Sequence, residues 1–210
     1  LIIVKARAEA MQRWVDETEE MASLAVLGLD EERVGQLCAE VRNQAVGTAS
    51  QHVYISHCWG QIGFACSGQI WAVLELQRLI EAPGSEAVFT QLLERHHDAG
   101  HTPLAEGVAK EVEKAIHSIP MNPPSCEVYF NHGYRVPAGE DPSVFLPYLI
   151  RQLVTPVRWD GVLRSSLHRG LRRFFECGPG ESLKDLMLFN SYSILKEDIR
   201  PYDLTTNVRV

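Results

Sequence analysis

The stretch 171–188 constrains the fold most, because it joins a short β-like run to a helical pattern through a three-residue turn. The β-like run ends on Gly178-Pro179-Gly180, and the pattern that follows predicts a helix from Glu181 to Leu188. Such a junction is how an α/β protein brings a backbone loop to the carboxyl edge of a sheet. A G-P-G turn alone indicates little more than a change of direction, so its meaning depends on the rest of the chain.

Residues 21–94 predict a smaller unit with its own order of elements. An apolar run at 21–28 is followed by a helix capped by Asp30, by two β-like runs at 52–56 and 62–66, and by a helix over 69–80. With a further strand near 89–93, this order is typical of a small ferredoxin-like α+β subdomain.

The remaining residues, 1–20 and 95–210, are expected to form a larger subdomain into which this unit is inserted. A helix is predicted over 1–20, and strands at 126–131 and 171–177 alternate with helices, as in a parallel sheet covered by helices. The predicted fold class is therefore α/β, with a hydrolase-like parallel sheet core and an inserted ferredoxin-like subdomain.

Composition excludes several classes of protein. The net charge of −7 argues against general nucleic-acid binding. No apolar run reaches the length of a membrane span, so no membrane association is expected. The five cysteines are scattered and lack C-x-x-C spacing, which favours neither a disulfide framework nor a zinc site.

Several segments, taken in chain order, carry a resemblance to a known family. They are the helix at 4–12, the Ser67-Gly68 pair, His101-Thr-Pro-Leu104, the V-Y-F-N strand at 128–131, Q-L-V-T-P-V-R-W at 152–159 and the G-P-G turn. Together they resemble the malonyl-CoA:acyl carrier protein transacylases, an acyltransferase family. Ser191-Tyr192-Ser193 is similar to the mitochondrial animal members, which implies a mitochondrial location.

The resemblance implies covalent acyl transfer in fatty-acid synthesis. A serine on a G-x-S-x-G turn takes the malonyl group from malonyl-CoA and passes it to the phosphopantetheine thiol of acyl carrier protein. The chemistry runs from thioester to ester to thioester, so no cofactor and no metal is expected.

Four residues are the candidates for the site. His101 corresponds to the family's general base, whose second ring nitrogen is held by a backbone carbonyl at or near Gln152. Arg7 corresponds to the arginine that holds the malonyl carboxylate by a two-pronged contact. Gln152 and His57 are assigned to substrate binding. From the residues alone, His101 could equally cap the helix that follows it, and Arg7 could be an ordinary surface residue.

The chain departs from the family in one main respect, because it contains no G-x-S-x-G motif. We expect that it is a fragment that begins after the serine turn and is inactive by itself. The alternative is a non-catalytic acyltransferase-like protein that binds acyl carrier protein or coenzyme A. His96, His97 and Asp98 lie close to His101 and raise a zinc hypothesis, which their spacing does not favour.

Overall fold

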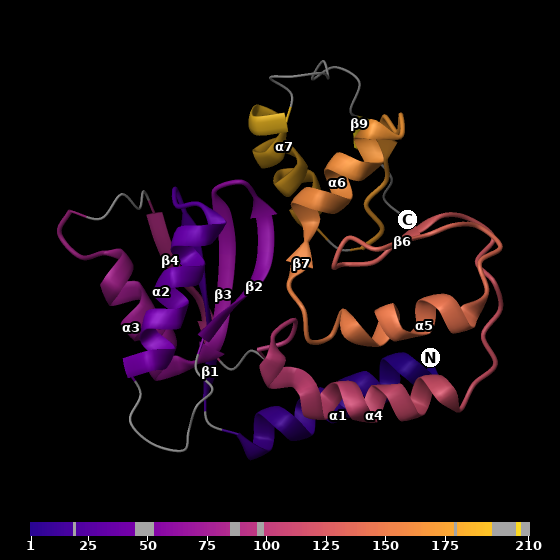
Figure 1. Cartoon of the computed structure of the whole chain (residues 1–210), viewed down its shortest axis with the longest axis horizontal. Coiled ribbons are helices and arrows are strands. Elements are labelled where there is room, and N and C mark those ends of the chain that lie inside the picture. The colour runs from indigo at the N-terminus through magenta and orange to yellow at the C-terminus, as the bar shows by residue number, and fades with distance from the viewer. Residues whose placement is uncertain are drawn as a thin grey trace.

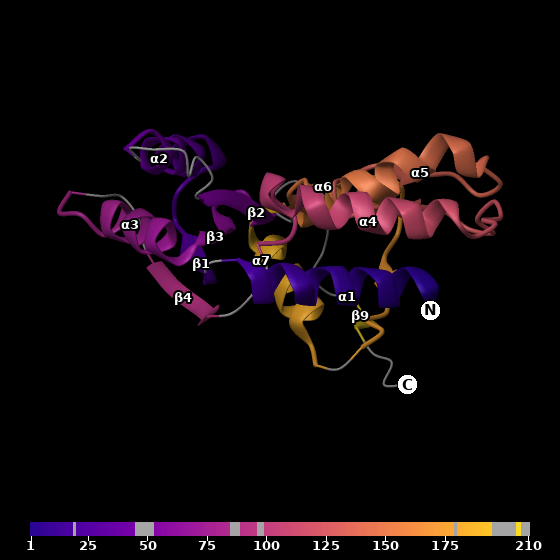
Figure 2. The same ribbon diagram turned by 90° about the horizontal axis from the view of Figure 1, so that it is seen from below.

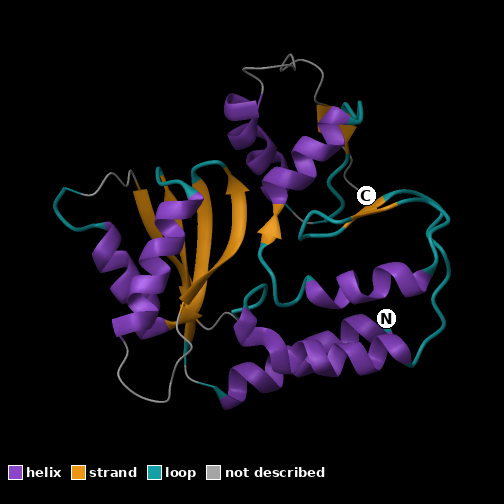
Figure 3. Cartoon of the chain, viewed as in Figure 1, coloured by secondary structure: helices purple, strands orange, loops and turns teal. Residues whose placement is uncertain are grey.

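A five-stranded sheet with two helices on one face makes up one half of the molecule, and a group of helices makes up the other (Figures 1 and 3). The computed structural model describes residues 1–18, 20–44, 53–84, 89–95, 99–178, 180–194 and 205–206. Within these ranges, no helix is both long enough and apolar enough to cross a lipid bilayer.

The first half has the predicted ferredoxin-like order of elements. Its four longer strands are antiparallel and lie in the order β4-β1-β3-β2. Because β1 lies between β3 and β4, the two β-α-β segments interlock as in ferredoxin-like units. The elements are β1 (Met21–Leu27), α2 (Glu31–Gln44), β2 (Val53–Gly60), β3 (Gly63–Gln69), α3 (Ile70–Ile80) and β4 (Phe89–Arg95).

Alternation along these strands gives the sheet two different faces. On the face covered by α2 and α3, fully buried side chains such as Leu24, Val26 and Phe64 pack with Leu76 of α3. The opposite face carries small or polar residues from the same strands, among them Ser23 and Ser67. Successive side chains along a strand point to opposite faces, so each strand contributes residues both to the core under the helices and to the opposite face.

The second half is built on the helices α1 (Ile2–Glu17), α4 (Glu106–His117) and α5 (Pro142–Arg151), preceded by a short 3-10 turn, Pro103–Ala105. Figures 1 and 2 show α1 lying along α4. Ala10 of α1 packs in one cluster with Val108, Val112 and Ile116 of α4 and with Leu153, just after α5. These residues recur at helical spacing, so one apolar stripe on each helix forms this core.

The strands around 126–131 and 171–177 do not pair with each other within the described residues. β5 (Val128–Tyr129) pairs antiparallel with β6 (Arg135–Val136), and β8 (Arg173–Phe174) pairs in parallel with β9 (Thr205–Thr206). The strand that lies between them in sequence, β7 (Val157–Arg158), pairs instead with β2 of the other half. β7 therefore does not lie between β5 and β8 in a common sheet. Instead it is the fifth strand of the larger sheet, which continues across the predicted subdomain boundary.

Two helices complete the chain. α6 (Trp159–His168) follows β7 directly, and α7 (Ser182–Ile194) is the helix predicted after the G-P-G turn. α7 docks on the β2–β3 hairpin, where the buried Asn190 side chain donates a hydrogen bond to the Trp59 carbonyl. α6 is absent from the sequence-based prediction: Trp159, Leu163 and Leu167 recur at helical spacing, but Gly161 and two adjacent serines have low helix propensity.

Candidate active site

His101 lies in a short turn whose backbone is held in an unusual conformation. Its φ angle is 61°, and it is the only non-glycine residue with positive φ among those described. This left-handed conformation costs an ordinary residue about 1–2 kcal/mol, so it persists only where the surroundings impose it. Here the buried Thr102 hydroxyl donates to the Ala99 carbonyl and accepts from the Leu104 N–H, which closes the turn.

The end of α5 holds His101 from the other side. The His101 backbone N–H donates to the Leu153 carbonyl at 3.0 Å, and ring Nδ1 lies 2.7 Å from the Gln152 carbonyl oxygen. The last carbonyls of a helix have no partner within the helix, and His101 satisfies two of the carbonyls that follow α5. The predicted contact between the histidine ring and the main chain at Gln152 is therefore present.

This contact fixes the protonation of the His101 ring. A carbonyl oxygen can only accept, so Nδ1 carries the proton and the lone pair of the neutral ring is on Nε2. The negative end of the α5 dipole also favours a positive charge at this place. The arrangement suits a group that takes a proton on Nε2 and becomes an imidazolium.

The structure brings His57 next to His101, although 44 positions separate them in the sequence. Their ring centroids are 5.3 Å apart and the ring planes meet at 73°, an edge-to-face arrangement. His57 belongs to β2, and its Nδ1 lies 3.0 Å from the Ser56 hydroxyl. Two of the four candidate residues are thus in direct contact, and a third, Gln152, holds one of them.

Arg7 is not part of this contact. It lies on α1, is exposed, and makes no hydrogen bond or ion pair with the described residues. Gln152 acts on His101 through its main chain rather than its side chain. The substrate-binding roles assigned to Arg7, Gln152 and His57 therefore stay predictions.

Arg158 fastens β7 to the ferredoxin-like half. Its guanidinium donates to Glu31 at 2.6 Å, to Asp160 at 3.1 Å and to the Cys58 sulfur at 3.2 Å. Burial raises the pKa of the Cys58 thiol to about 12, although the neighbouring Arg158 charge acts in the opposite direction. This network keeps β7, and with it the turn after α5, against the strand that carries His57.

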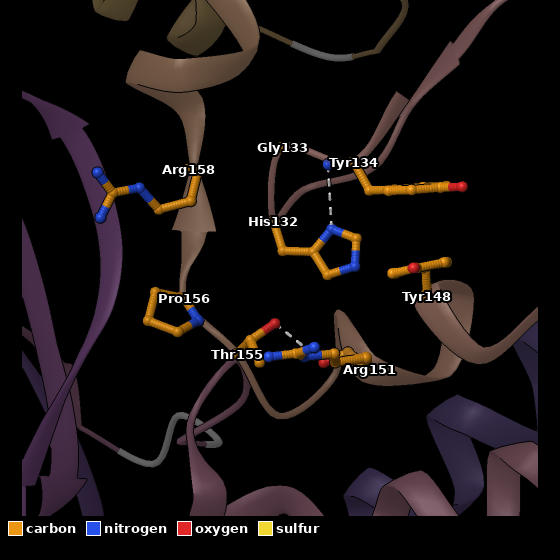
Figure 4. Close-up of a pocket in the computed structure, with 8 residues that line it drawn as sticks. All are labelled: His132, Gly133, Tyr134, Tyr148, Arg151, Thr155, Pro156 and Arg158. Atoms are coloured by element: carbon orange, nitrogen blue, oxygen red, sulfur yellow. Dashed lines mark hydrogen bonds between the residues drawn. The ribbon is translucent and has the colours of Figure 1, made fainter. Parts of the chain in front are cut away.

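A pocket of about 550 Å³ opens beside the turn that follows α5, lined by His132, Gly133, Tyr134, Tyr148, Arg151, Thr155, Pro156 and Arg158 (Figure 4). The Tyr134 and Tyr148 rings stack with centroids 3.7 Å apart. His132 Nδ1 accepts from the Tyr134 N–H at 3.4 Å, which leaves the proton of the neutral ring on Nε2.

The charges around this pocket favour an anionic group. Burial lowers the pKa of His132, and the nearby Arg151 charge lowers it further, while the Tyr148 carbonyl has a smaller, opposite effect. Because the net effect lowers the pKa below its ordinary value of 6.5, His132 is neutral at pH 7. Its Nε2 is buried without a hydrogen-bond partner of good geometry among the described residues. Arg151 also makes no side-chain ion pair with them, so both groups can donate to a carboxylate or phosphate oxygen.

The zinc hypothesis rests on His96, His97 and Asp98, which lie outside the described residues. Within the described ranges, no group of three or more histidine, cysteine, aspartate or glutamate residues is placed to hold a metal ion.

The sequence did not identify Ser23, Ser56 and Ser67 as site residues, although these buried serines are hydrogen-bonded in a row that leads to His57. The available signal was a polar residue within an apolar strand, as at Ser23 in M-A-S-L-A-V-L.

Comparison with curated proteins finds similarity along most of the chain. A probable mitochondrial malonyl-CoA-acyl carrier protein transacylase from Drosophila melanogaster is 25% identical over 198 residues, which cover 89% of this chain and 49% of that protein. No family model matches the chain.

Comparison with solved structures finds the same kind of protein. An acyl carrier protein S-malonyltransferase from Vibrio cholerae superimposes with a TM-score of 0.79 at 25% identity, over 99% of this chain and 61% of that one. A malonyl-transacylase solved in complex with a type II polyketide-synthase acyl carrier protein gives a TM-score of 0.77 at 23% identity, over 97% of this chain and 59% of that one.

The curated relative and the two solved structures named above are malonyl transacylases by name. The fold is the acyltransferase fold over the part that they share with it. The chain spans about half the length of the curated relatives it matches.

Proposed function

We propose that this chain is the part of a malonyl-CoA:acyl carrier protein transacylase that carries the general base. The protein would transfer a malonyl group from malonyl-CoA to the phosphopantetheine thiol of acyl carrier protein, in fatty-acid synthesis. The names of the relatives support the reaction class, the substrate and the carrier protein. The name of the Drosophila relative supports a mitochondrial location.

The observation that carries the proposal is the way His101 is held. A left-handed backbone, a hydrogen bond from its N–H and a second one from Nδ1 all fix a ring whose Nε2 has the basic lone pair. A histidine that merely capped the next helix would need none of these, and the cap of that turn is supplied by Thr102. Strain that the surroundings impose on one histidine is a feature of functional sites.

In the proposed reaction a serine, which this chain does not contain in a G-x-S-x-G turn, attacks the malonyl thioester carbonyl. His101 Nε2 takes the serine proton as the oxygen–carbon bond forms, and gives it to the coenzyme A sulfur as the carbon–sulfur bond breaks. The carrier thiol then attacks the malonyl ester. His101 Nε2 takes the thiol proton as the new carbon–sulfur bond forms and gives it to the serine oxygen as the ester bond breaks. The Gln152 carbonyl stabilises the imidazolium in both steps.

Arg7 is the proposed partner of the malonyl carboxylate, because a guanidinium that has no other partner among the described residues can form two parallel hydrogen bonds with it. The alternative function is a non-catalytic protein that binds acyl carrier protein or coenzyme A. It would need the same surfaces but no serine, so the sequence upstream of this chain distinguishes the two.

The test is transfer of labelled malonyl from malonyl-CoA to acyl carrier protein, measured with the protein that includes the sequence upstream of this chain. His101→Ala should lower the rate at least about 100-fold, since a positioned general base contributes about 10²–10⁴. His117→Ala is the matched control, because His117 is exposed at the end of α4 and pairs only loosely with Glu113. Equal activity of the two variants would refute the role of His101, and saturable carrier binding without transfer would establish the alternative.

A further inference from the structure

Three buried serines form a continuous row of hydroxyl groups across the sheet, and the row ends at His57. Ser23 of β1 and Ser67 of β3 are 2.7 Å apart, and Ser67 and Ser56 of β2 are also 2.7 Å apart. Ser56 also donates to the Ala65 carbonyl at 3.1 Å and lies 3.0 Å from His57 Nδ1. We call Ser23, Ser67 and Ser56 the serine ladder.

A β-bulge at Ser56 brings His57 onto the same face of the sheet as the ladder. Ile55 pairs with Cys66 but His57 pairs with Ala65, so Ser56 is an extra residue in β2. Cys66 faces the core under α2 and α3, and its neighbour Ala65 faces the other way. Residues directly opposite each other share a face, so His57 also points away from that core. Without the bulge, alternation would have placed His57 beside Ile55 on the core face.

Only one arrangement of protons turns all four of these contacts into hydrogen bonds. The Ala65 carbonyl can only accept, so it takes the single Ser56 proton. Ser56 must then accept from Ser67 and from His57 Nδ1, and Ser67 must accept from Ser23. Each hydroxyl has one proton and two acceptor positions, which this chain of bonds uses without a conflict.

From this we infer that the serine ladder makes His57 a positioning residue, which keeps its proton on Nδ1 and so presents no N–H from Nε2 beside the His101 ring. An imidazole with its proton on Nε2, packed edge-to-face with ring centroids 5.3 Å apart, could donate a hydrogen bond into the site around His101. The ladder prevents this because it requires the proton on the other nitrogen. The kinetic part of this inference rests on the proposed function, and the assignment of the proton does not.

The experiment is nitrogen NMR of this chain labelled with ¹⁵N-histidine, which reports the protonated nitrogen of each ring. The spectrum should show the Nδ1–H form for both His57 and His101. In Ser56→Ala, His57 should change predominantly to the Nε2–H form while His101, held by Gln152, does not change. Ser23→Ala is the matched control: it removes the far end of the ladder and should leave His57 in the Nδ1–H form.

The two hypotheses fail in different ways. An Nε2–H form of His57 in the unmodified protein, or an unchanged His57 in Ser56→Ala, would overturn the role of the ladder whatever the activity. If transfer activity is found, Ser56→Ala should lower kcat with little change in KM for malonyl-CoA, and unchanged kcat would overturn the positioning role. Absence of transfer in a protein whose His57 is in the Nδ1–H form would count against the proposed function alone.

Discussion

Gly63 lies at the start of β3, where α7 docks on the β2–β3 hairpin, and its replacement by alanine measures how tightly the two pack. A Cβ atom at this position would lie 2.8 and 2.9 Å from two ring carbons of Phe189 and 3.3 Å from Leu27 Cδ2. Carbon atoms pack best at about 3.5–4.0 Å, so the Phe189 ring must retreat by about 0.6 Å or more. The φ angle of Gly63 is not positive, so the clash is the main effect.

The expected cost follows from two opposing terms. Extra carbon in a packed site costs about 1–3 kcal/mol, while alanine restricts the unfolded chain and stabilises by about 0.4–1 kcal/mol. Gly63→Ala should therefore destabilise the protein by about 1–2 kcal/mol. Gly35→Ala is the matched control, because nothing lies within 4 Å of its Cβ position in the helix α2, and it should stabilise by about 0.5–1 kcal/mol.

Urea unfolding followed by circular dichroism gives both free energies. Adding Phe189→Leu to Gly63→Ala should relieve the clash, with a coupling energy on the order of 1 kcal/mol between the two changes. A Gly63→Ala protein as stable as the unmodified one would refute the close approach of α7. So would a double variant whose two effects simply add.

Two further predictions concern Cys58 and Arg7. Because burial raises the pKa of Cys58 from 9.0 to about 12, the unfolded chain loses this proton first as the pH rises, and the free energy of unfolding should fall between about pH 9 and pH 12. Urea unfolding at several pH values measures the fall; the slope should be shallower in Cys58→Ala, and equal slopes would contradict the burial argument. Arg7→Ala should reduce the preference for malonyl-CoA over acetyl-CoA at least about tenfold, since hydrogen bonds to charged groups contribute about 1.5–3 kcal/mol. Competition between the two thioesters in the transfer assay measures this preference, and an unchanged ratio would remove Arg7 from the site.

Local sequence signals determined most of the helices. Asp141-Pro142 is a local start signal at the beginning of α5, where the Asp141 carboxylate accepts from the Ser143 N–H at 2.8 Å. Asp30 likewise accepts from the Arg33 N–H at the start of α2. Caps and apolar spacing act within a few residues, so they can be read without knowing the rest of the fold.

The order of strands and helices in 21–95 was also available from the sequence, because alternation of apolar residues, turns and helical spacing occurs along one continuous segment. His101 and Gln152 could be selected only by resemblance to a family. Nothing local distinguishes His101 from His117, although the two differ completely in surroundings.

Tertiary structure alone decided the partners of these residues. The bulge at Ser56, the contact of His57 with His101, and the pairing of β7 with β2 all join segments far apart in the chain. A shift of one residue in strand register moves a side chain to the other face of a sheet. The residue pattern of β2 gives no sign of the shift that occurs at Ser56. The sequence could therefore name His57 as a candidate, while its neighbours depend on a register that only the packed sheet determines.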